Sequence, residues 1–456
     1  MSDVDAAADR ETDVVVVGAG LAGLTAARWL DGRDVDVRVL DARPQVGGRL
    51  RSREVDGVVV DLGTQWVGPG QRHLRRLAAD LGCEQVRQRA EGDALRYDGN
   101  GTHRGKTAID SLPLPARLNL GAAVRLLDRR SGEVPLEAPH RAPDATAWDE
   151  TTLATWRDGA LRTRRARALF DAAVRSSFGS EPADLSYLSV LFAVRAAGGF
   201  ERLTGLDGRP RTRIAGGVQT LADRMAADLS GRVHTDSPVR AIAHDEDGVV
   251  VRTDDESVAA RHVVVATAAS RVACLDFDPH LPARRAALSR RPPHGAVVTC
   301  VATYEVPFWR PDLSGDVLDE EGPVCRTRDV SPLDGERGVL VGQLFGNAAR
   351  RWSERTRSER RSMVLDRFAE YFGDRAVEAT GYTDVAWPNV PWSGGCCGAA
   401  FPPGILTTVG EALREPVGRV HWAGAETATR WPGHMDGGVQ AGKRAAAELV
   451  GRLRTD

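Results

Sequence analysis

The chain has 456 residues, and its 61 Lys and Arg against 63 Asp and Glu give a formal net charge of −2 at pH 7. This balance excludes the basic surface of a nucleic-acid-binding protein, and no apolar run approaches the ~20 residues that cross a bilayer. The six cysteines lack the spacing of a disulfide framework or a metal site. The sequence predicts a cytoplasmic protein of two or more domains, with no nucleic-acid, membrane or metal partner.

A glycine-rich turn follows the first predicted strand. In residues 13–30, "DVVVVGAGLAGLTAARWL", a valine run typical of a buried parallel strand precedes three glycines and a helical pattern. Such a turn lets the backbone approach a pyrophosphate at a helix N-terminus. A second strand, residues 36–42, ends at Asp41, whose carboxylate can accept hydrogen bonds from an adenosine ribose. The predicted cofactor contacts in the turn are Gly18, Gly20, Leu21, Ala22 and Gly23.

The next residues extend this motif. "RPQVGGRL", residues 43–50, supplies two arginines whose planar forks suit phosphate oxygens, and "DLGTQWVGPGQ" follows at 61–71. With these extensions the chain resembles the flavin-dependent amine oxidase family, which usually has Glu where this chain has Asp41. The resemblance implies FAD as the cofactor. It assigns further contacts to Ala42, Arg43, Gly48, Arg49, Gly63, Thr64, Gln65 and Trp66.

The middle of the chain resembles the same family less closely. Residues 213–242 resemble the return to the cofactor domain, with Val239 beside adenine, and 248–255 and 261–270 are predicted strands. The predicted fold is α/β, with a discontinuous Rossmann-like FAD-binding domain and an α+β substrate-binding domain. The FAD-binding domain comprises 1–80, 212–287 and 385–456, and the substrate-binding domain comprises 81–211 and 288–384. A Thr356–Glu359 capping box predicts a helix over 355–373.

Residues 393–449 carry the strongest resemblance, to monoamine oxidases. Small apolar residues at 439, 442, 446, 449 and 453 predict a helix lying against a sheet, with its positive end toward the flavin. The resemblance places Gly424, Glu426 and Met435 at the cofactor, with Trp387 and Trp392 nearby. In "SGGCC" it places Cys396 where monoamine oxidases bond the flavin through a thioether. The alternative is that Cys396 and Cys397 are two small buried residues beside the ring.

The expected catalytic residues depart from the family. Monoamine oxidases hold the amine between two tyrosines in a mostly apolar pocket, and the matching positions here are Cys397 and His434. His434 is either a proton acceptor or a polar wall. Thr299 occupies the position of a lysine that related oxidases use near flavin N5. This difference predicts either slow reoxidation by oxygen or the use of another electron acceptor. Arg326, in "CRTRD" (325–329), either holds a carboxylate or carbonyl group of the substrate or is an exposed arginine.

These features predict FAD-dependent oxidation of a C–N bond to an imine. The missing tyrosines and lysine favour a specialised or biosynthetic amine or amide-type substrate over a simple monoamine. The alternatives are an L-amino-acid oxidase, a desaturase, and a flavin-binding partner protein that has lost catalysis. The family also leads us to expect a homodimer.

Overall fold

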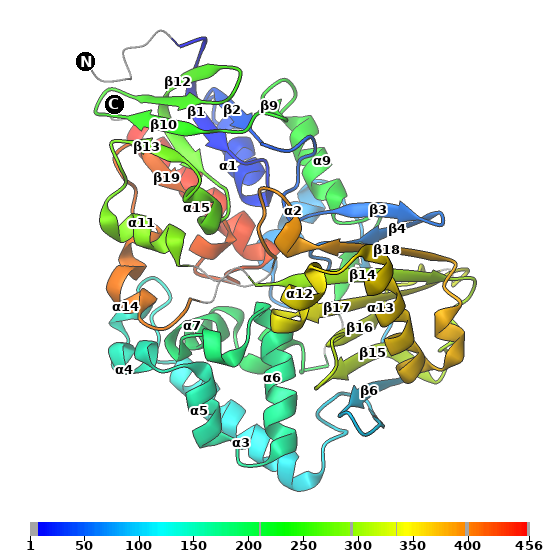
Figure 1. Cartoon of the computed structure of the whole chain (residues 1–456). Helices are drawn as coiled ribbons and strands as arrows, with labels where there is room; N and C mark the ends of the chain where they lie inside the picture. Colours follow the sequence, from blue (N-terminus) through cyan, green and yellow to red (C-terminus); the bar gives the residue numbers. More distant parts are fainter. Residues whose placement is uncertain (1–7, 209–210, 292–294, 334, 397–400, 454–456) are drawn as a thin grey trace.

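The computed structural model describes residues 8–208, 211–291, 295–333, 335–396 and 401–453. Its first large sheet has eight strands in the order β13-β10-β11-β12-β1-β2-β9, with β19 also paired to β12 (Figure 1). The central strand β1 (Arg10–Val17) runs parallel to both neighbours, β12 (Ser257–Val265) and β2 (Val37–Leu40). Its valines are buried because both faces of the sheet are covered, as expected for a central parallel strand. The other strands are β9 (Val233–His234), β10 (Ala241–His244), β11 (Val249–Arg252), β13 (Asp276–Asp278) and β19 (Val420–Trp422).

Two helices from opposite ends of the chain pack together beside this sheet. They are α1 (Leu21–Asp31) and α15 (Met435–Leu453), drawn in blue and red in Figure 1. A Cβ atom on Gly442 would lie 2.3 Å from the Ala22 carbonyl oxygen, so glycine permits this close approach. The predicted apolar stripe on 439–453 is a packing face: Gly442 lies directly against α1, and Val439 and Leu449 belong to the same buried cluster as the β1 valines.

The second large sheet has seven strands, in the order β18-β14-β17-β16-β15-β6-β7. Their bounds are β18 (Gly381–Ala386), β14 (Val297–Tyr304), β17 (Gly338–Phe345), β16 (Arg326–Asp329), β15 (Leu313–Asp319), β6 (Asp93–Tyr97) and β7 (Thr102–Gly105). One face packs against α13 (Arg357–Phe372), whose predicted capping box is confirmed. Along β14, Val298 and Cys300 belong to this face, whereas Val297 and Val301 belong to the other, as the two-residue period of a strand requires.

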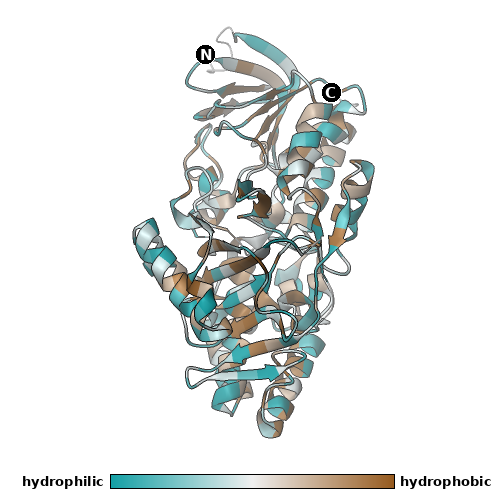
Figure 2. Ribbon diagram, turned by 90° about the vertical axis from the view of Figure 1, so that its right-hand side faces the viewer, coloured by the Kyte–Doolittle hydropathy of each residue, from teal (hydrophilic) through white to brown (hydrophobic). Residues whose placement is uncertain are grey.

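The other face of the second sheet packs against a group of helices that follow β7 in the sequence (Figure 1). Figure 2 shows hydrophobic residues concentrated on the interior strands and hydrophilic residues on the outer faces of the helices. The helices are α3 (Leu114–Ser131), α4 (Ala145–Glu150), α5 (Leu153–Ala160), α6 (Arg164–Phe178), α7 (Tyr187–Ala197) and α8 (Phe200–Thr204). The remaining elements are β3 (Ser52–Val55), β4 (Val58–Asp61), α2 (Arg72–Asp80), β5 (Gln85–Arg87), β8 (Thr212–Ile214), α9 (Gln219–Asp228), α10 (Ala269–Val272), α11 (Ala283–Arg290), α12 (Gly346–Ser353) and α14 (Ile405–Val409).

The fold is the predicted mixture of a Rossmann-like α/β sheet and a second α+β part. Every strand of the eight-stranded sheet lies within the ranges predicted for FAD binding, although the domain boundaries themselves stay predictions. Within the residues listed at the start of this subsection, no helix has both the length and the apolar character of a membrane span.

Candidate active site

One cavity joins the glycine-rich turn of the first sheet to the inner face of the second sheet. Gly18 has φ +105°, a left-handed conformation that glycine adopts without strain. A Cβ atom on Gly23 would lie 1.9 Å from the Gly18 carbonyl oxygen. The turn therefore needs glycine at both positions to bring the α1 N-terminus and its free N–H groups to the cavity wall.

Asp41 closes the nucleotide end of the cavity. Its carboxylate is buried and accepts hydrogen bonds from the backbone N–H groups of Ala19 (2.7 Å) and Arg43 (2.9 Å). Arg43 in turn donates to the Gly48 carbonyl oxygen (2.8 Å). Asp41 thus ties the two glycine turns together with its carboxylate fixed at the cavity wall, where a ribose hydroxyl could also donate to it.

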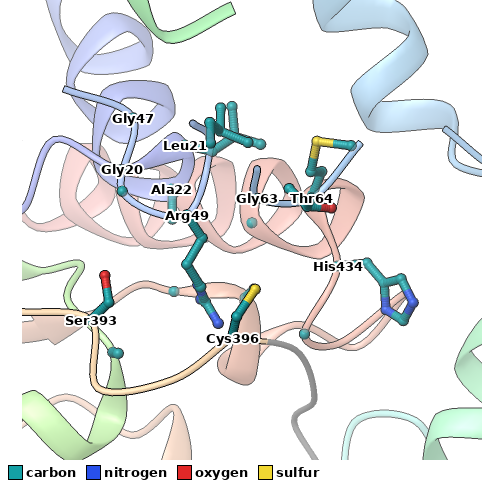
Figure 3. Close-up of a pocket in the computed structure, with 18 of the residues that line it drawn as sticks. Gly20, Leu21, Ala22, Gly47, Arg49, Gly63, Thr64, Ser393, Cys396 and His434 are labelled. Atoms are coloured by element: carbon teal, nitrogen blue, oxygen red, sulfur yellow. The ribbon is translucent and has the colours of Figure 1, made fainter. Parts of the chain in front are cut away.

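Arg49, which lines the cavity, forms an ion pair with Glu426 behind the wall. Nη1 of Arg49 lies 2.9 Å from Oε1 of Glu426, whose side chain is buried. A Cβ atom on Gly63 would lie 2.0 Å from the Arg49 carbonyl oxygen, so Gly63 allows the two segments to touch. The carboxylate therefore orients Arg49, whose side chain extends into the cavity in Figure 3.

The residues present fit a flavin dinucleotide. Oε1 of Gln65 is buried at the cavity wall and has no hydrogen-bond partner in the described chain, while its Nε2 donates to the Asp61 carbonyl oxygen (2.9 Å). A buried polar atom of this kind normally has a partner, so this atom indicates a ligand with a donor group. The N-termini of α1 and α15 face the same cavity and suit anionic groups.

The structure brings most of the predicted cofactor residues to the cavity wall. These are Gly18, Gly20, Leu21, Ala22, Asp41, Ala42, Arg43, Gly48, Arg49, Gly63, Thr64, Gln65, Trp66, Val239, Trp392, Cys396, Gly424, His434 and Met435. Three predicted contacts do not line it: Gly23 packs on Gly18, Glu426 pairs with Arg49, and Trp387 lies behind the wall. Trp387 is fully buried, with Nε1 donating to the Leu62 carbonyl oxygen (2.9 Å), so its structural position is one of support.

Cys396 is buried and lies at the cavity wall. Its backbone N–H donates to the Gly295 carbonyl oxygen (2.9 Å), which fixes the residue to the start of the second sheet. Figure 3 shows its sulfur pointing into the same space as the Arg49 side chain. Cys397, the other half of the predicted pair, lies outside the described residues.

His434 lies at the N-terminus of α15 and its ring packs edge-on against Trp431, with centroids 5.2 Å apart. Nδ1 is 3.0 Å from the Pro432 carbonyl oxygen. Because a carbonyl oxygen only accepts, Nδ1 carries a proton, and in the neutral ring Nε2 is an acceptor. Burial lowers the pKa of His434, and the charge of Arg211 lowers it further against the opposing effect of the Pro432 carbonyl. The ring is therefore neutral at pH 7.

Thr299 is buried in β14 and lines the cavity. Neither lysine of the chain lines it: Lys106 is exposed and paired with Asp93 (3.0 Å), and Lys443 belongs to α15. Among the described side chains there is also no group of three or more His, Cys, Asp or Glu that could hold a metal ion. No lysine is therefore among the described residues that line the cavity.

The cavity wall at the end away from Asp41 differs most from our expectation. Arg326 is only 7% exposed and lines the cavity, so the prediction of an exposed arginine is wrong. The cavity lining is mostly apolar, as expected, but Arg202, Arg211, Arg328 and Gln343 also line it and make this wall polar. Arg328 could have been found from the sequence, since residues two apart in a strand share one face. Arg211 carries no such local signal.

Comparisons with known proteins agree with this geometry. The sequence profile described as flavin containing amine oxidoreductase matches residues 21–450. The Mycobacterium tuberculosis protein named "Putative flavin-containing monoamine oxidase AofH" is 38% identical over 445 residues, covering 97% of each chain. Horse (Equus caballus) amine oxidase [flavin-containing] A is 34% identical over 451 residues, covering 97% of this chain and 85% of its own.

A solved structure extends the similarity to the whole fold. Wild-type putrescine oxidase bound to putrescine matches with a TM-score of 0.92 and 29% identity, covering 97% of this chain and 99% of the other. The profile match, the sequence identity and the shared fold cover both sheets and the cavity between them. The chain therefore belongs to the family of flavin-containing amine oxidoreductases.

Proposed function

We propose that the protein uses FAD to oxidise the C–N bond of a specialised amine to an imine. The observation that carries this is the single cavity running from Asp41 and the glycine turns to His434 and Thr299. Bound flavin would accept the hydride that leaves the substrate carbon. The residues that would hold it are those of the two glycine turns, Arg49, Gln65 and the N-terminus of α15.

Anaerobic mixing tests this function directly. Purified flavin-loaded protein is mixed with amines, amino acids and N-acyl amines while the absorbance of oxidised flavin is followed. Loss of absorbance with one class establishes catalysis and names that class. Retention of the colour with every compound would support the alternative of a flavin-binding protein without catalysis.

His434 would receive the proton of the substrate ammonium at Nε2. The Pro432 carbonyl fixes the tautomer that leaves Nε2 as an acceptor, and burial keeps the ring neutral. The other reading, a polar wall, requires no change in protonation. The two readings differ in the pH dependence that they predict.

We expect His434→Asn to slow anaerobic flavin reduction about 100-fold, the lower end of what a general base contributes. In the unsubstituted enzyme the rate should fall as pH drops through the lowered pKa of His434, because the protonated ring accepts nothing. Stopped-flow reduction across pH measures both effects. His140→Asn is the matched control, since His140 pairs with Glu411 away from the cavity. An acidic limb that persists in His434→Asn would favour the polar wall.

The residue at position 299 bears on which molecule reoxidises the reduced flavin. Because no lysine lines the cavity, we propose that oxygen reoxidises this enzyme slowly and that another acceptor serves in its place. A cation placed beside the ring would stabilise the negative charge that develops on reduced oxygen.

Thr299→Lys is therefore expected to speed reoxidation by oxygen about tenfold, equal to about 1.4 kcal/mol in the barrier. The enzyme is reduced anaerobically, mixed with oxygenated buffer, and followed by the return of flavin absorbance. Thr299→Val keeps the shape without the charge and should behave as the parent. Equal rates in Thr299→Lys and Thr299→Val would contradict the role assigned to the missing lysine.

A further inference from the structure

Three arginines form a cluster at the substrate end of the cavity. This arginine cluster consists of Arg211, Arg326 and Arg328, and all three line both the main cavity and a smaller neighbouring pocket. Arg326 and Arg328 point to one face of β16 because they are two residues apart in the strand. The cluster thus combines side chains from β16 and from the segment that precedes β8.

One carboxylate faces these three positive charges. Asp316 lies 3.5 Å from Nε of Arg326 and 3.5 Å from Nη1 of Arg328. Arg211 has no ion pair with a carboxylate of the described chain, although Asp207 and Asp316 act on it at longer range. The cluster therefore carries more positive than negative charge inside the protein.

Burial makes this excess charge costly. Arg326 and Arg328 are 7% and 8% exposed, and both share Asp316 as their ion-pair partner in the described chain. Burial and the neighbouring Arg326 lower the pKa of Arg328 to about 9, and burial lowers that of Arg211 to about 10. Both stay protonated at pH 7. Buried charges are normally paired, so the cluster indicates an anionic ligand.

The register of the second sheet places this cluster relative to the flavin end. Thr299 in β14 pairs with Gln343 in β17, which pairs with Arg326 in β16, and all three line the cavity. Two strand spacings separate the Cα atoms of Thr299 and Arg326 by about 10 Å. A substrate lying along this row can place one group at the ring and another at the arginines.

We propose that the substrate is an amine that also carries a carboxylate, and that the arginine cluster binds the carboxylate. The inference rests on the proposed function, since it assumes that an amine lies at the flavin end. Guanidinium forks match the two oxygens of a carboxylate with parallel hydrogen bonds. Carboxylate binding by the arginine cluster would give the specialised substrate a definite chemical class, with amino acids and other amino carboxylates favoured over plain amines.

The charges on the cavity wall also disfavour diamines, which carry a second ammonium group in place of the carboxylate. Asp41, at the nucleotide end, is the one acidic residue among the described lining residues. A diamine such as putrescine, which the similar putrescine oxidase binds, would place its second ammonium beside the arginine cluster. Like charges at close range repel, so this chain should be a poor putrescine oxidase.

Matched substrate pairs test the proposal. Anaerobic flavin reduction is measured with phenylalanine against phenethylamine, 4-(aminomethyl)benzoate against benzylamine, and 6-aminohexanoate against hexylamine. We expect the carboxylate of at least one pair to react about 100-fold faster than its neutral partner, because a site built for a polar group rejects analogues that lack it. The pair that shows this difference also indicates the distance between the amine and the carboxylate of the preferred substrate.

Three results would overturn parts of this account, and they can be told apart. Faster reaction of the neutral amine in every pair overturns the carboxylate inference and leaves amine oxidation standing. Flavin reduction by none of the compounds overturns amine oxidation itself. Calorimetric titration with benzoate and 6-aminohexanoate then tests the cluster independently of turnover, and absence of binding overturns the inference.

Variants separate recognition from a structural role. In Arg328→Gln and Arg211→Gln the ratio of carboxylate to neutral rates should fall about tenfold, with carboxylate binding weakened in titration. The melting temperature of Arg211→Gln should hold or rise, because that change removes a buried charge without an ion pair in the described chain, whereas Arg328→Gln also removes an ion pair with Asp316. Arg164→Gln, on an exposed side chain, controls for loss of one positive charge. A lowered melting temperature with an unchanged ratio in both cluster variants would mean that the arginines are structural.

Discussion

Gly23→Ala should abolish the retention of FAD. The added Cβ atom would lie 1.9 Å from the Gly18 carbonyl oxygen, far inside contact distance. Gly18 cannot move away, because its N–H donates to the Leu40 carbonyl oxygen (2.8 Å) and it follows directly after β1. The clash must therefore displace the N-terminus of α1, which forms the cavity wall. We expect flavin-free protein, measured as the ratio of flavin to protein absorbance after purification.

The same change should lower the free energy of unfolding by about 1–3 kcal/mol, which is typical of overpacking in a buried site. Gly32→Ala is the control, because its Cβ atom would lie at 3.5 Å from the Arg28 carbonyl oxygen and its φ is −66°. That variant should keep its flavin and its stability. A full complement of flavin in Gly23→Ala would show that the close approach of turn and helix is not required for binding.

The nucleotide end of the site was predictable because its signals are local. The valine run, the three glycines and Asp41 lie within 29 residues of one another, and each has a conformational reason for its position. The same holds for the helix capped by Thr356, whose capping box involves residues three apart. At Arg49 the resemblance supplied the residue, and the structure added the ion pair with Glu426, 377 positions further on.

The substrate end was not predictable in the same way, because its residues come together through tertiary contacts. Arg211 lies 115 positions before Arg326, and only the packing of the segment before β8 against β16 brings them to one wall. In a chain with 61 basic residues, most of them arginine, composition gives no means of choosing the buried ones. Trp387 shows the converse: the resemblance placed it near the flavin, whereas its fully buried ring supports the wall from behind.

Acid precipitation of the enzyme should leave the flavin attached to the protein, and Cys396→Ala should release it into the supernatant. The Cys396 side chain is buried at the cavity wall, and its backbone N–H donates to the Gly295 carbonyl oxygen. A thioether to the 8α-methyl group of the flavin, as in the monoamine oxidases that this stretch resembles, would survive denaturation, whereas hydrogen bonds would not. Forming that C–S bond would break the S–H bond and one C–H bond of the methyl group; the two electrons would pass through the flavin to the enzyme's electron acceptor, and the two protons would be released.

Two cysteine variants make the result specific. Cys83→Ala removes a buried thiol far from the cavity wall and should leave the flavin attached, and Cys397→Ala tests the adjacent residue. Release of flavin by Cys397→Ala alone would move the bond to that neighbour. Release from the unsubstituted enzyme would make Cys396 a small apolar contact of the ring, and FAD would then be held by the glycine turns, Arg49 and the helix N-termini alone. Those groups line the cavity along its length, so the enzyme would still bind FAD but lose it on unfolding.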